Sequence, residues 1–191
     1  MNNKKVLLIL TLVLVLLIAS ASVLYNNLSQ STAPDQLATQ EPTAAPDETT
    51  PQLMQAPDFT VYDIDGNAVN LSDYFGKPIV VNFWASWCGP CKMEMPDFQE
   101  KYLELRDEVT FLMVNMTDGD RETVEIAAAF IAEAGYTFPV LFDTAASAAM
   151  TYGVYSLPST YFIDADGNAV ARATGAIDSA TLQQGIDMIC P

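Results

Sequence analysis

Two cysteines separated by two residues are the feature of this sequence with the clearest chemistry. The segment Trp87-Cys88-Gly89-Pro90-Cys91 follows an apolar, β-branched run and precedes a stretch with helical character. At a helix N-terminus the free backbone N–H groups and the helix dipole stabilise a thiolate, so Cys88 is expected to be the attacking nucleophile. Cys91, almost one turn later, can attack the Cys88 sulfur and release a captured partner. The spacing predicts a reversible redox pair.

Two other uses of this cysteine pair are disfavoured. A structural zinc site needs four ligands, and the chain contains no histidine and only one further cysteine, Cys190. A purely structural disulfide between Cys88 and Cys91 would close so short a loop that it gains little chain entropy. We therefore predict no metal site and no cofactor other than the Cys88–Cys91 disulfide itself. Cys190 is interpreted as a small apolar residue or a spare thiol.

The composition excludes several classes of function. The chain has 191 residues, 24 acids against 8 bases, a formal charge of −16 and no histidine. Without histidine there is no imidazole acid–base catalyst and no Cys–His nucleophile pair. Such an acidic surface repels phosphate, so nucleic-acid binding is not expected, and it also disfavours contact with an anionic lipid surface.

The first part of the chain predicts export. Lys4 and Lys5 precede an apolar run from Val6 to about Leu24, which is close to the ~20 residues that span a bilayer. We expect a signal anchor over residues 1–25, with the remainder on the extracytoplasmic side. Cleavage after the small-residue pattern Ala19-Ser20-Ala21 is the alternative, and it would release a secreted protein.

Two further segments follow the expected anchor. Residues 26–56 are rich in Pro, Thr, Ala, Gln and acids, a composition that buries too little apolar surface to fold, so a disordered linker is predicted. Residues 57–191 are globular in composition. Their pattern predicts an α/β domain in which parallel crossovers are followed by an antiparallel hairpin. The expected strands are 59–62, 68–71, 79–84, 109–116, 138–142, 160–163 and 168–173, and the expected helices are 88–106, 122–134, 144–152 and 179–189.

Three separate blocks resemble one known family. Residues 82–96, Asn-Phe-Trp-Ala-Ser-Trp-Cys-Gly-Pro-Cys-Lys-Met-Glu-Met-Pro, are similar to the active-site block of the TlpA/ResA-like branch of the thioredoxin superfamily. Residues 56–59 with 71–78 resemble its N-terminal block, and residues 157–164 resemble its cis-proline loop. The resemblance covers about residues 57–189. It implies a thioredoxin fold, a central mixed sheet flanked by helices, with an added N-terminal β-hairpin and a central βα insertion.

The resemblance also implies where a substrate binds. It implies a cis peptide between Leu157 and Pro158 beside the sulfurs, and a substrate chain that pairs with the backbone of Leu157. An ordinary trans turn proline is the alternative that the residues alone favour. Trp87 is expected to cover the sulfurs and to offer an apolar contact to the substrate, together with Gly89 and Pro90. Trp84 is expected in the core.

Glu94 is the third candidate catalytic residue. Cytoplasmic thioredoxins carry a buried aspartate where this chain has Asn82, and an asparagine cannot exchange a proton with the inner cysteine. Glu94 lies three residues after Cys91, on the same helix face, and the glutamate of this motif tunes the cysteines in the TlpA/ResA-like branch. We predict that Glu94 replaces the missing proton carrier. The alternative is a solvated acid in an early helical turn.

The resulting hypothesis is an extracytoplasmic disulfide reductase. Its expected partners are exported proteins with disulfides, including apocytochrome c in cytochrome c maturation, and a membrane thiol-electron transporter of the CcdA/DsbD type as reductant. The alternatives are an oxidant that donates disulfides, a thiol peroxidase of the peroxiredoxin-like branch, and a non-catalytic binding module. The intact Cys88 and Cys91 pair disfavours the last of these.

Overall fold

The computed structural model describes residues 37–39 and 54–190 of the chain. The expected anchor over residues 1–25 lies outside these residues, as does most of the expected linker over residues 26–56. Within 37–39 and 54–190, no helix is both long and apolar enough to cross a membrane. Inside the expected linker, Leu37–Thr39 forms a strand, β1, that the sequence did not suggest.

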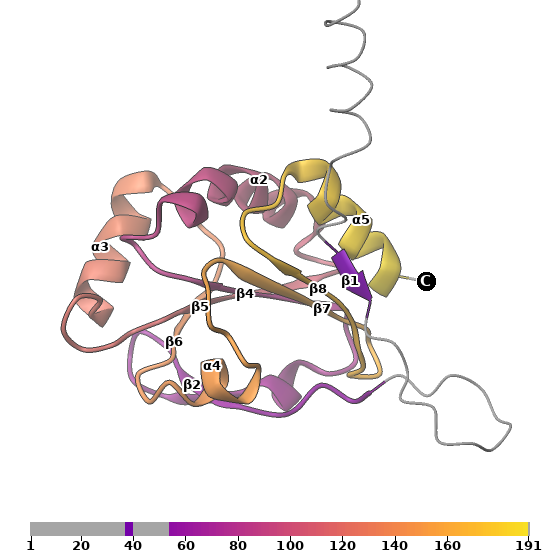
Figure 1. Ribbon diagram of the computed structural model, residues 1–191, viewed down its shortest axis with the longest axis horizontal. Helices are drawn as coiled ribbons and strands as arrows, with labels where there is room; N and C mark the ends of the chain where they lie inside the picture. Colours follow the sequence, from indigo (N-terminus) through magenta and orange to yellow (C-terminus); the bar gives the residue numbers. More distant parts are fainter. Residues whose placement is uncertain (1–36, 40–53, 191) are drawn as a thin grey trace, which may run out of the picture. The chain divides into compact units, whose positions relative to one another are not determined.

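The described residues form one eight-stranded mixed sheet with the strand order β1-β8-β7-β4-β5-β6-β2-β3 (Figure 1). The central strand β4 pairs parallel with β5 and antiparallel with β7, so the sheet combines both directions. The remaining strands are β2 (Thr60–Tyr62), β3 (Ala68–Asn70), β4 (Ile79–Trp84), β5 (Thr110–Asn115), β6 (Val140–Phe142), β7 (Ser159–Ile163) and β8 (Ala169–Thr174). The helical segments are η1 (Leu71–Tyr74), α2 (Gly89–Leu105), α3 (Val124–Ala134), α4 (Ser147–Thr151) and α5 (Ser179–Ile189).

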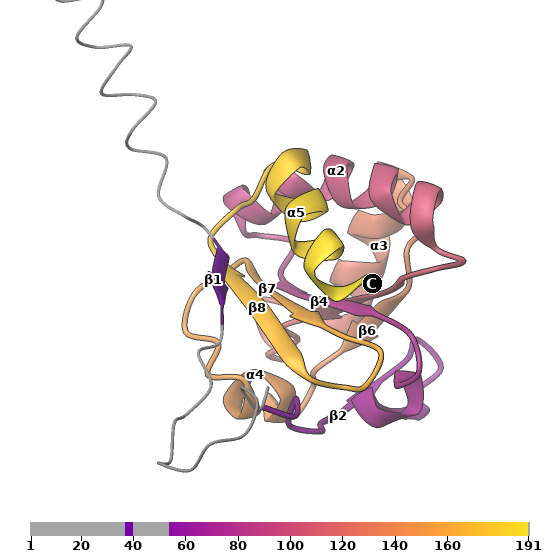
Figure 2. The same cartoon turned by 90° about the vertical axis from the view of Figure 1, so that its right-hand side faces the viewer.

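Helices cover the two faces of the sheet unequally. The helices α2, α3 and α5 lie on one face, while α4 and η1 lie on the other, and the two views agree (Figures 1 and 2). Each face has its own apolar core. Phe98 of α2 and Ile186 of α5 belong to the first core, whereas Leu71 of η1 and Tyr152, which follows α4, belong to the second.

The central strand β4 is buried along its whole length. Its residues alternate between the two cores: Val80 and Trp84 contact the first, and Val81 and Phe83 contact the second. A run of β-branched and aromatic residues forms such a strand because apolar surface is removed from water on both faces. Cys88 follows the last residue of this buried strand by only four positions, so the strand fixes where the cysteine pair begins.

Local capping sets the helix boundaries. The α3 helix begins after Thr123, whose side chain accepts a hydrogen bond from the Ile126 N–H at 3.3 Å, and it ends at Gly135 in the left-handed region. Sequence analysis expected a helix from residue 144, but α4 begins at Ser147. The reason is Asp143, whose carboxylate accepts hydrogen bonds from the N–H groups of Ala148 and Ala149 and holds the preceding residues in a turn.

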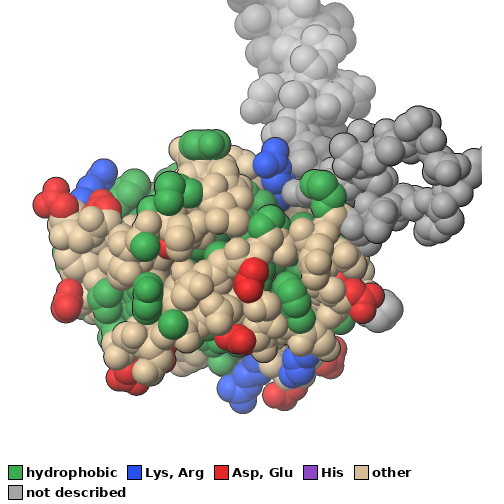
Figure 3. Space-filling view, turned by 90° about the horizontal axis from the view of Figure 1, so that it is seen from below, with side chains coloured by type: hydrophobic (Ala, Val, Ile, Leu, Met, Phe, Trp, Pro, Cys, Tyr) green, Lys and Arg blue, Asp and Glu red, His purple; other side chains and the backbone are tan. Residues whose placement is uncertain are grey.

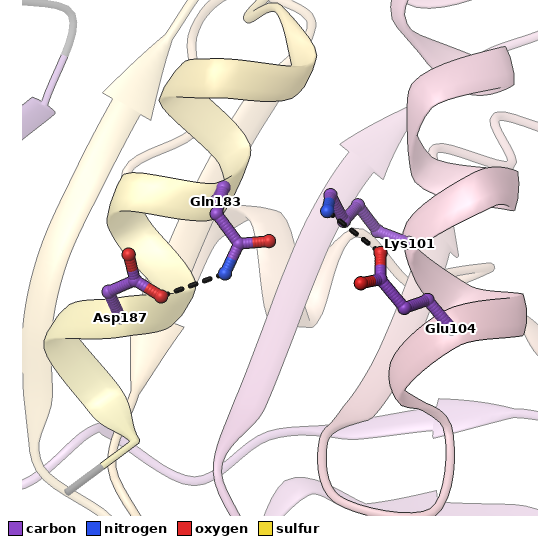
Figure 4. Close-up of polar contacts among 4 residues, drawn as sticks. All are labelled: Lys101, Glu104, Gln183 and Asp187. Carbon is purple, nitrogen blue, oxygen red and sulfur yellow. Dashed lines mark hydrogen bonds and ion pairs between the residues drawn. The ribbon is translucent and has the colours of Figure 1, made fainter.

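The surface carries mostly local polar contacts. On α2, Lys101 and Glu104 form an ion pair of 2.8 Å, and on the neighbouring α5 the Gln183 amide donates to Asp187 at 2.7 Å (Figure 4). Exposed pairs of this kind contribute little to stability. On the face that carries α4, acidic side chains are spread out and the hydrophobic side chains form small separate patches (Figure 3).

Candidate active site

The cysteine pair lies where β4 passes into α2. Cys88 is the N-cap residue of α2, with extended backbone, and Pro90 lies in the first turn. Proline is favoured there because the first helical N–H groups have no partner inside the helix. The Cys88 sulfur accepts a hydrogen bond from the Cys91 N–H at 3.2 Å. A helix start therefore points a backbone donor at this sulfur, which is the arrangement that stabilises a thiolate.

The two cysteines form a disulfide in this structure. The S–S distance is 2.09 Å and the two Cα atoms lie 5.3 Å apart. Cys91 is fully buried in the first core, and Cys88 keeps 4 % exposure. The structure thus describes the oxidised state, in which only Cys88 of the two cysteines keeps some exposure to solvent.

The cis-proline loop lies beside this disulfide. The Leu157–Pro158 peptide is cis, as the resemblance implied. Leu157 lines a hollow of about 440 Å³ together with Trp87, Cys88, Gly89 and Pro90. Four of the five residues expected at the substrate surface therefore line one hollow, whereas the fifth, Pro158, is buried and does not line it.

The hollow also contains residues that sequence reasoning did not single out. Tyr155 stands on its rim and is 98 % exposed. The sequence offered only the position of this aromatic residue, two positions before Leu157, because its exposure is seen only in the structure. The remaining lining residues come from the loop after β5 and from the cis-proline loop: Met116, Asp118, Val154 and Ser156.

The two tryptophans divide as expected from the sequence. Trp84 is fully buried and its ring lies 5.9 Å from that of Phe130. Trp87 is 41 % exposed, and the Arg121 guanidinium lies over its ring, 3.9 Å from the centroid. Trp87 thus presents an apolar surface to the hollow while a cation holds its ring.

Glu94 is buried rather than solvated, with 2 % exposure. One carboxylate oxygen accepts from the Asn82 amide at 2.8 Å, and the other accepts from the Ile177 N–H at 3.0 Å. Burial raises the pKa of the Glu94 carboxyl to about 7, against the lowering effect of these two hydrogen bonds, and Asp97 raises it further. A group with this pKa can gain or lose a proton near neutral pH.

Cys190 stands apart from this site, as the C-cap of α5. It is a free, partly buried cysteine, and burial raises the pKa of its thiol, with Glu108 and Asp187 adding to the effect. Among residues 37–39 and 54–190, no group of three or more His, Cys, Asp or Glu side chains is arranged to hold a metal ion.

The strand–helix junction with its cysteine pair, the cis-proline loop and the buried carboxyl group define a thioredoxin-like redox domain. Residues 54–172 match the AhpC/TSA family. The thiol-disulfide oxidoreductase ResA of Geobacillus thermodenitrificans (strain NG80-2) is 35% identical over 137 residues, which cover 71% of this chain and 76% of that protein. The thioredoxin-like protein YneN of Bacillus subtilis (strain 168) is 34% identical over 134 residues, covering 70% and 78%. The chain belongs to the ResA-like thiol–disulfide oxidoreductases of the thioredoxin superfamily.

Solved structures agree with this assignment. The exposed lipoprotein thioredoxin Etrx1 of Streptococcus pneumoniae strain TIGR4 has 34% sequence identity and a TM-score of 0.58, covering 69% of this chain and 98% of that one. A DsbE-type thiol:disulfide interchange protein of Chlorobium tepidum has 28% identity and a TM-score of 0.63, covering 72% and 96%. The thioredoxin-like α/β fold with a mixed sheet is thereby confirmed.

Proposed function

We propose that this protein is an extracytoplasmic protein-disulfide reductase that works through Cys88 and Cys91. The observation that carries the proposal is the Cys88 sulfur itself. It accepts a backbone hydrogen bond at the start of α2 and lines an apolar hollow beside the cis-proline loop. A thiolate in this place can attack a disulfide that a bound polypeptide presents.

The reaction proceeds in two exchanges. The Cys88 thiolate attacks one sulfur of the substrate disulfide, and the other substrate sulfur leaves and takes up a proton. Cys91 then loses its proton and attacks the Cys88 sulfur, and the second substrate sulfur leaves as a thiol. The substrate has gained two electrons and two protons, and the Cys88–Cys91 disulfide has formed. A membrane thiol-electron transporter of the CcdA/DsbD type is the proposed donor for its re-reduction.

The substrate chain is proposed to bind across the hollow. The backbone of Leu157 would pair with the substrate, and the rings of Trp87 and Tyr155 would contact the side chains next to its cysteine. The apolar lining of the hollow and the exposure of Tyr155 support this placement. Gly89 and Pro90, which follow Cys88 and also line the hollow, carry no long side chain that would cover its sulfur.

Glu94 is proposed as the proton carrier for Cys91. Its burial, its position one turn after Cys91 and a pKa of about 7 support this role. Glu94→Gln keeps the shape of the side chain and removes its proton exchange. The reduction potential of the Cys88–Cys91 couple is expected to change slope near pH 7 in the unaltered protein, and Glu94→Gln should remove this change of slope. If the reduction potentials of Glu94→Gln and of the unaltered protein depended on pH in the same way, the proposed role of Glu94 would be contradicted.

The cellular setting is also a proposal. The expected anchor over residues 1–25 would hold the domain on the outer side of the membrane, and the alternative of signal cleavage would secrete it. The relatives named ResA and the exposed lipoprotein thioredoxin support an extracytoplasmic place. The proposed substrates are exported proteins with disulfides, in cytochrome c maturation or in related redox repair.

The decisive test is turnover of a protein disulfide. The protein should accelerate the reduction of insulin by dithiothreitol, Cys88→Ser should abolish this activity, and Cys190→Ser should leave it unchanged. A reduction potential near about −270 mV supports reduction, whereas a value near about −120 mV would make the protein an oxidant. Peroxide consumption that survives Cys91→Ser would instead support a thiol peroxidase.

A further inference from the structure

A second buried carboxyl group lies beside the active-site loop, and the exchange reaction does not require it. Glu122 has 0 % exposure. Its Oε1 accepts a hydrogen bond from the Ser86 N–H at 2.7 Å, and its Oε2 accepts one from the Ser86 hydroxyl at 2.6 Å. The Asn115 amide donates to Oε1 at 2.7 Å. One side chain therefore binds the loop that precedes Cys88 and the end of β5 at the same time.

The partners of Glu122 are themselves held in orientation. The Thr117 hydroxyl donates to Asn115 Oδ1 at 2.8 Å, which leaves the Asn115 amide nitrogen facing Glu122. The Met116 N–H donates to the Trp84 carbonyl at 2.8 Å and joins the two chain segments just before they separate. After this backbone hydrogen bond, the two segments are joined by the hydrogen bonds that the Glu122 carboxyl group accepts from Ser86 and Asn115.

The segment before Glu122 is a compact turn that also reaches the hollow. Asp118 Oδ1 accepts from the N–H groups of Asp120 and Glu122, both at 2.9 Å. Asp118 lines the hollow, and Arg121 lies over the ring of Trp87. Two of the three loops that line the hollow thus converge on Glu122. One is the loop with Trp87 and Cys88, and the other is the loop with Met116 and Asp118, whereas the cis-proline loop forms the third wall.

Among the residues that the structure describes, the hydrogen-bond partners of the Glu122 carboxyl group are all uncharged. Arg121, its sequence neighbour, contacts Trp87, and the ion pair found among the described residues joins Lys101 and Glu104 on α2. A buried carboxyl group without a cationic partner is costly to maintain, even when neutral donors satisfy its oxygens. Removing it would leave the Ser86 N–H and the Asn115 amide without their acceptor. A protein is expected to keep such a costly buried group where the relative position of the two loops affects its function.

We propose that Glu122 is a positioning residue that holds these two of the three loops around the hollow in register and thereby determines the affinity for polypeptide disulfides. This inference rests on the proposed function, because it concerns how that substrate is bound. Glu122 touches neither the sulfurs nor the substrate. Its effect passes through Ser86 to Trp87 on one side and through Asn115 to Met116 on the other. A small disulfide that needs only the Cys88 sulfur should not depend on it.

The test compares two substrates in single-turnover reactions of the pre-reduced protein. The first is a disulfide-bonded peptide with an apolar residue beside its cysteine, and the second is hydroxyethyl disulfide. Saturation with the peptide separates its dissociation constant from the limiting rate of exchange. Glu122→Ala should weaken peptide binding about tenfold, which corresponds to about 1.4 kcal/mol, and leave both the limiting rate and the small-disulfide rate within about twofold.

Two conservative variants test whether the loss in peptide affinity comes from the hydrogen bonds of Glu122. Glu122→Gln keeps an acceptor for the Ser86 N–H and for the Asn115 amide, so it should bind the peptide within about twofold of the unaltered protein. Ser86→Ala removes only the bond to Oε2, worth about 0.5–1.5 kcal/mol, and it decides the question if Glu122→Ala does not fold. It should weaken peptide binding about threefold. The exposed Glu125→Gln is the matched control and should change nothing.

The outcomes are distinct. The inference would be overturned if Glu122→Ala reacted more slowly with both substrates to the same degree. It would also be overturned if Glu122→Ala and Ser86→Ala lowered the melting temperature but left the peptide affinity unchanged. In either case Glu122 would have only a structural role. Failure of the unaltered protein to reduce either disulfide would overturn the proposed function itself.

Discussion

The Asn82 amide donates a hydrogen bond of 2.8 Å to the Glu94 carboxyl group inside the protein, one helical turn after Cys91. The same amide nitrogen lies 3.1 Å from the Thr160 hydroxyl, and Asn82 Oδ1 has no partner within the described part of the chain. The Glu94 carboxyl group is held there by two neutral donors, and its burial is the largest effect, which raises its pKa.

This raised pKa predicts how stability depends on pH. An unfolded glutamate titrates at about 4.3, whereas the folded group titrates at about 7. Between these values the native state binds the additional proton, so the free energy of unfolding decreases as the pH rises from about 4.3 to about 7 and this contribution levels off above. Glu94→Gln should remove that decrease. Chemical denaturation of the oxidised protein at a series of pH values measures it.

The matched control is Glu100→Gln on the same helix, where the side chain is exposed. It should leave the difference in unfolding free energy between pH 5 and pH 8 as it is in the unaltered protein. If Glu94→Gln also left that difference unchanged, Glu94 would titrate in the folded protein like a solvated acid.

A second prediction concerns the reactivity of the thiols. In the Cys91→Ser variant, two thiols remain. Cys88 lies at a helix start, where a backbone N–H points at its sulfur, whereas burial raises the pKa of Cys190. Iodoacetamide at pH 7 should therefore label Cys88 at least about tenfold faster than Cys190. Mass spectrometry of timed samples gives both rates in one experiment. Labelling of Cys88 no faster than a free cysteine peptide would refute the activated nucleophile.

Much of this site could be predicted from the sequence because each of its parts lies within one short, continuous segment of the chain. The strand that ends at Trp84, the helix that starts at Cys88 and the cis-proline loop each lie within one short segment, and the resemblance identified all three. Trp87 and Leu157 follow from those segments. The fold class and the buried central strand could be predicted for the same reason.

The remainder depends on contacts between segments that are far apart in sequence. Glu122 lies 36 residues from Ser86, and its sequence context is that of an acid near a helix start, where acids are ordinarily exposed. The pairing of β1 with β8 is likewise invisible, because Leu37–Thr39 stands in a polar, proline-rich region. No local pattern distinguishes such residues from surface residues, so only the packed structure identifies them.

A third prediction addresses Tyr155. Because the side chain is 98 % exposed, its removal should leave the melting temperature unchanged. Loss of an aromatic contact to a bound peptide costs about 0.5–1.5 kcal/mol, so Tyr155→Ala should weaken the binding of an apolar disulfide peptide roughly two- to tenfold. Isothermal titration of the peptide in the Cys88→Ser/Cys91→Ser background, which cannot react with the disulfide, measures this, and Tyr62→Ala, away from the hollow, serves as the control. Unchanged affinity would place the peptide elsewhere.

The fourth prediction concerns how closely α5 packs on the sheet. Glycine inside a helix is ordinarily destabilising by about 0.5–1 kcal/mol relative to alanine, so replacing one usually helps. Gly185 of α5 is different, because a Cβ atom there would overlap the ring of Phe162 on β7. Gly185→Ala should therefore destabilise the protein by about 1–3 kcal/mol, the usual cost of overpacking. Urea unfolding measures the change, and Gln184→Ala, exposed on the same helix, should stay within about 0.5 kcal/mol of the unaltered protein. A more stable Gly185→Ala protein would mean that α5 moves freely over the sheet and that Gly185 is not needed for its close approach.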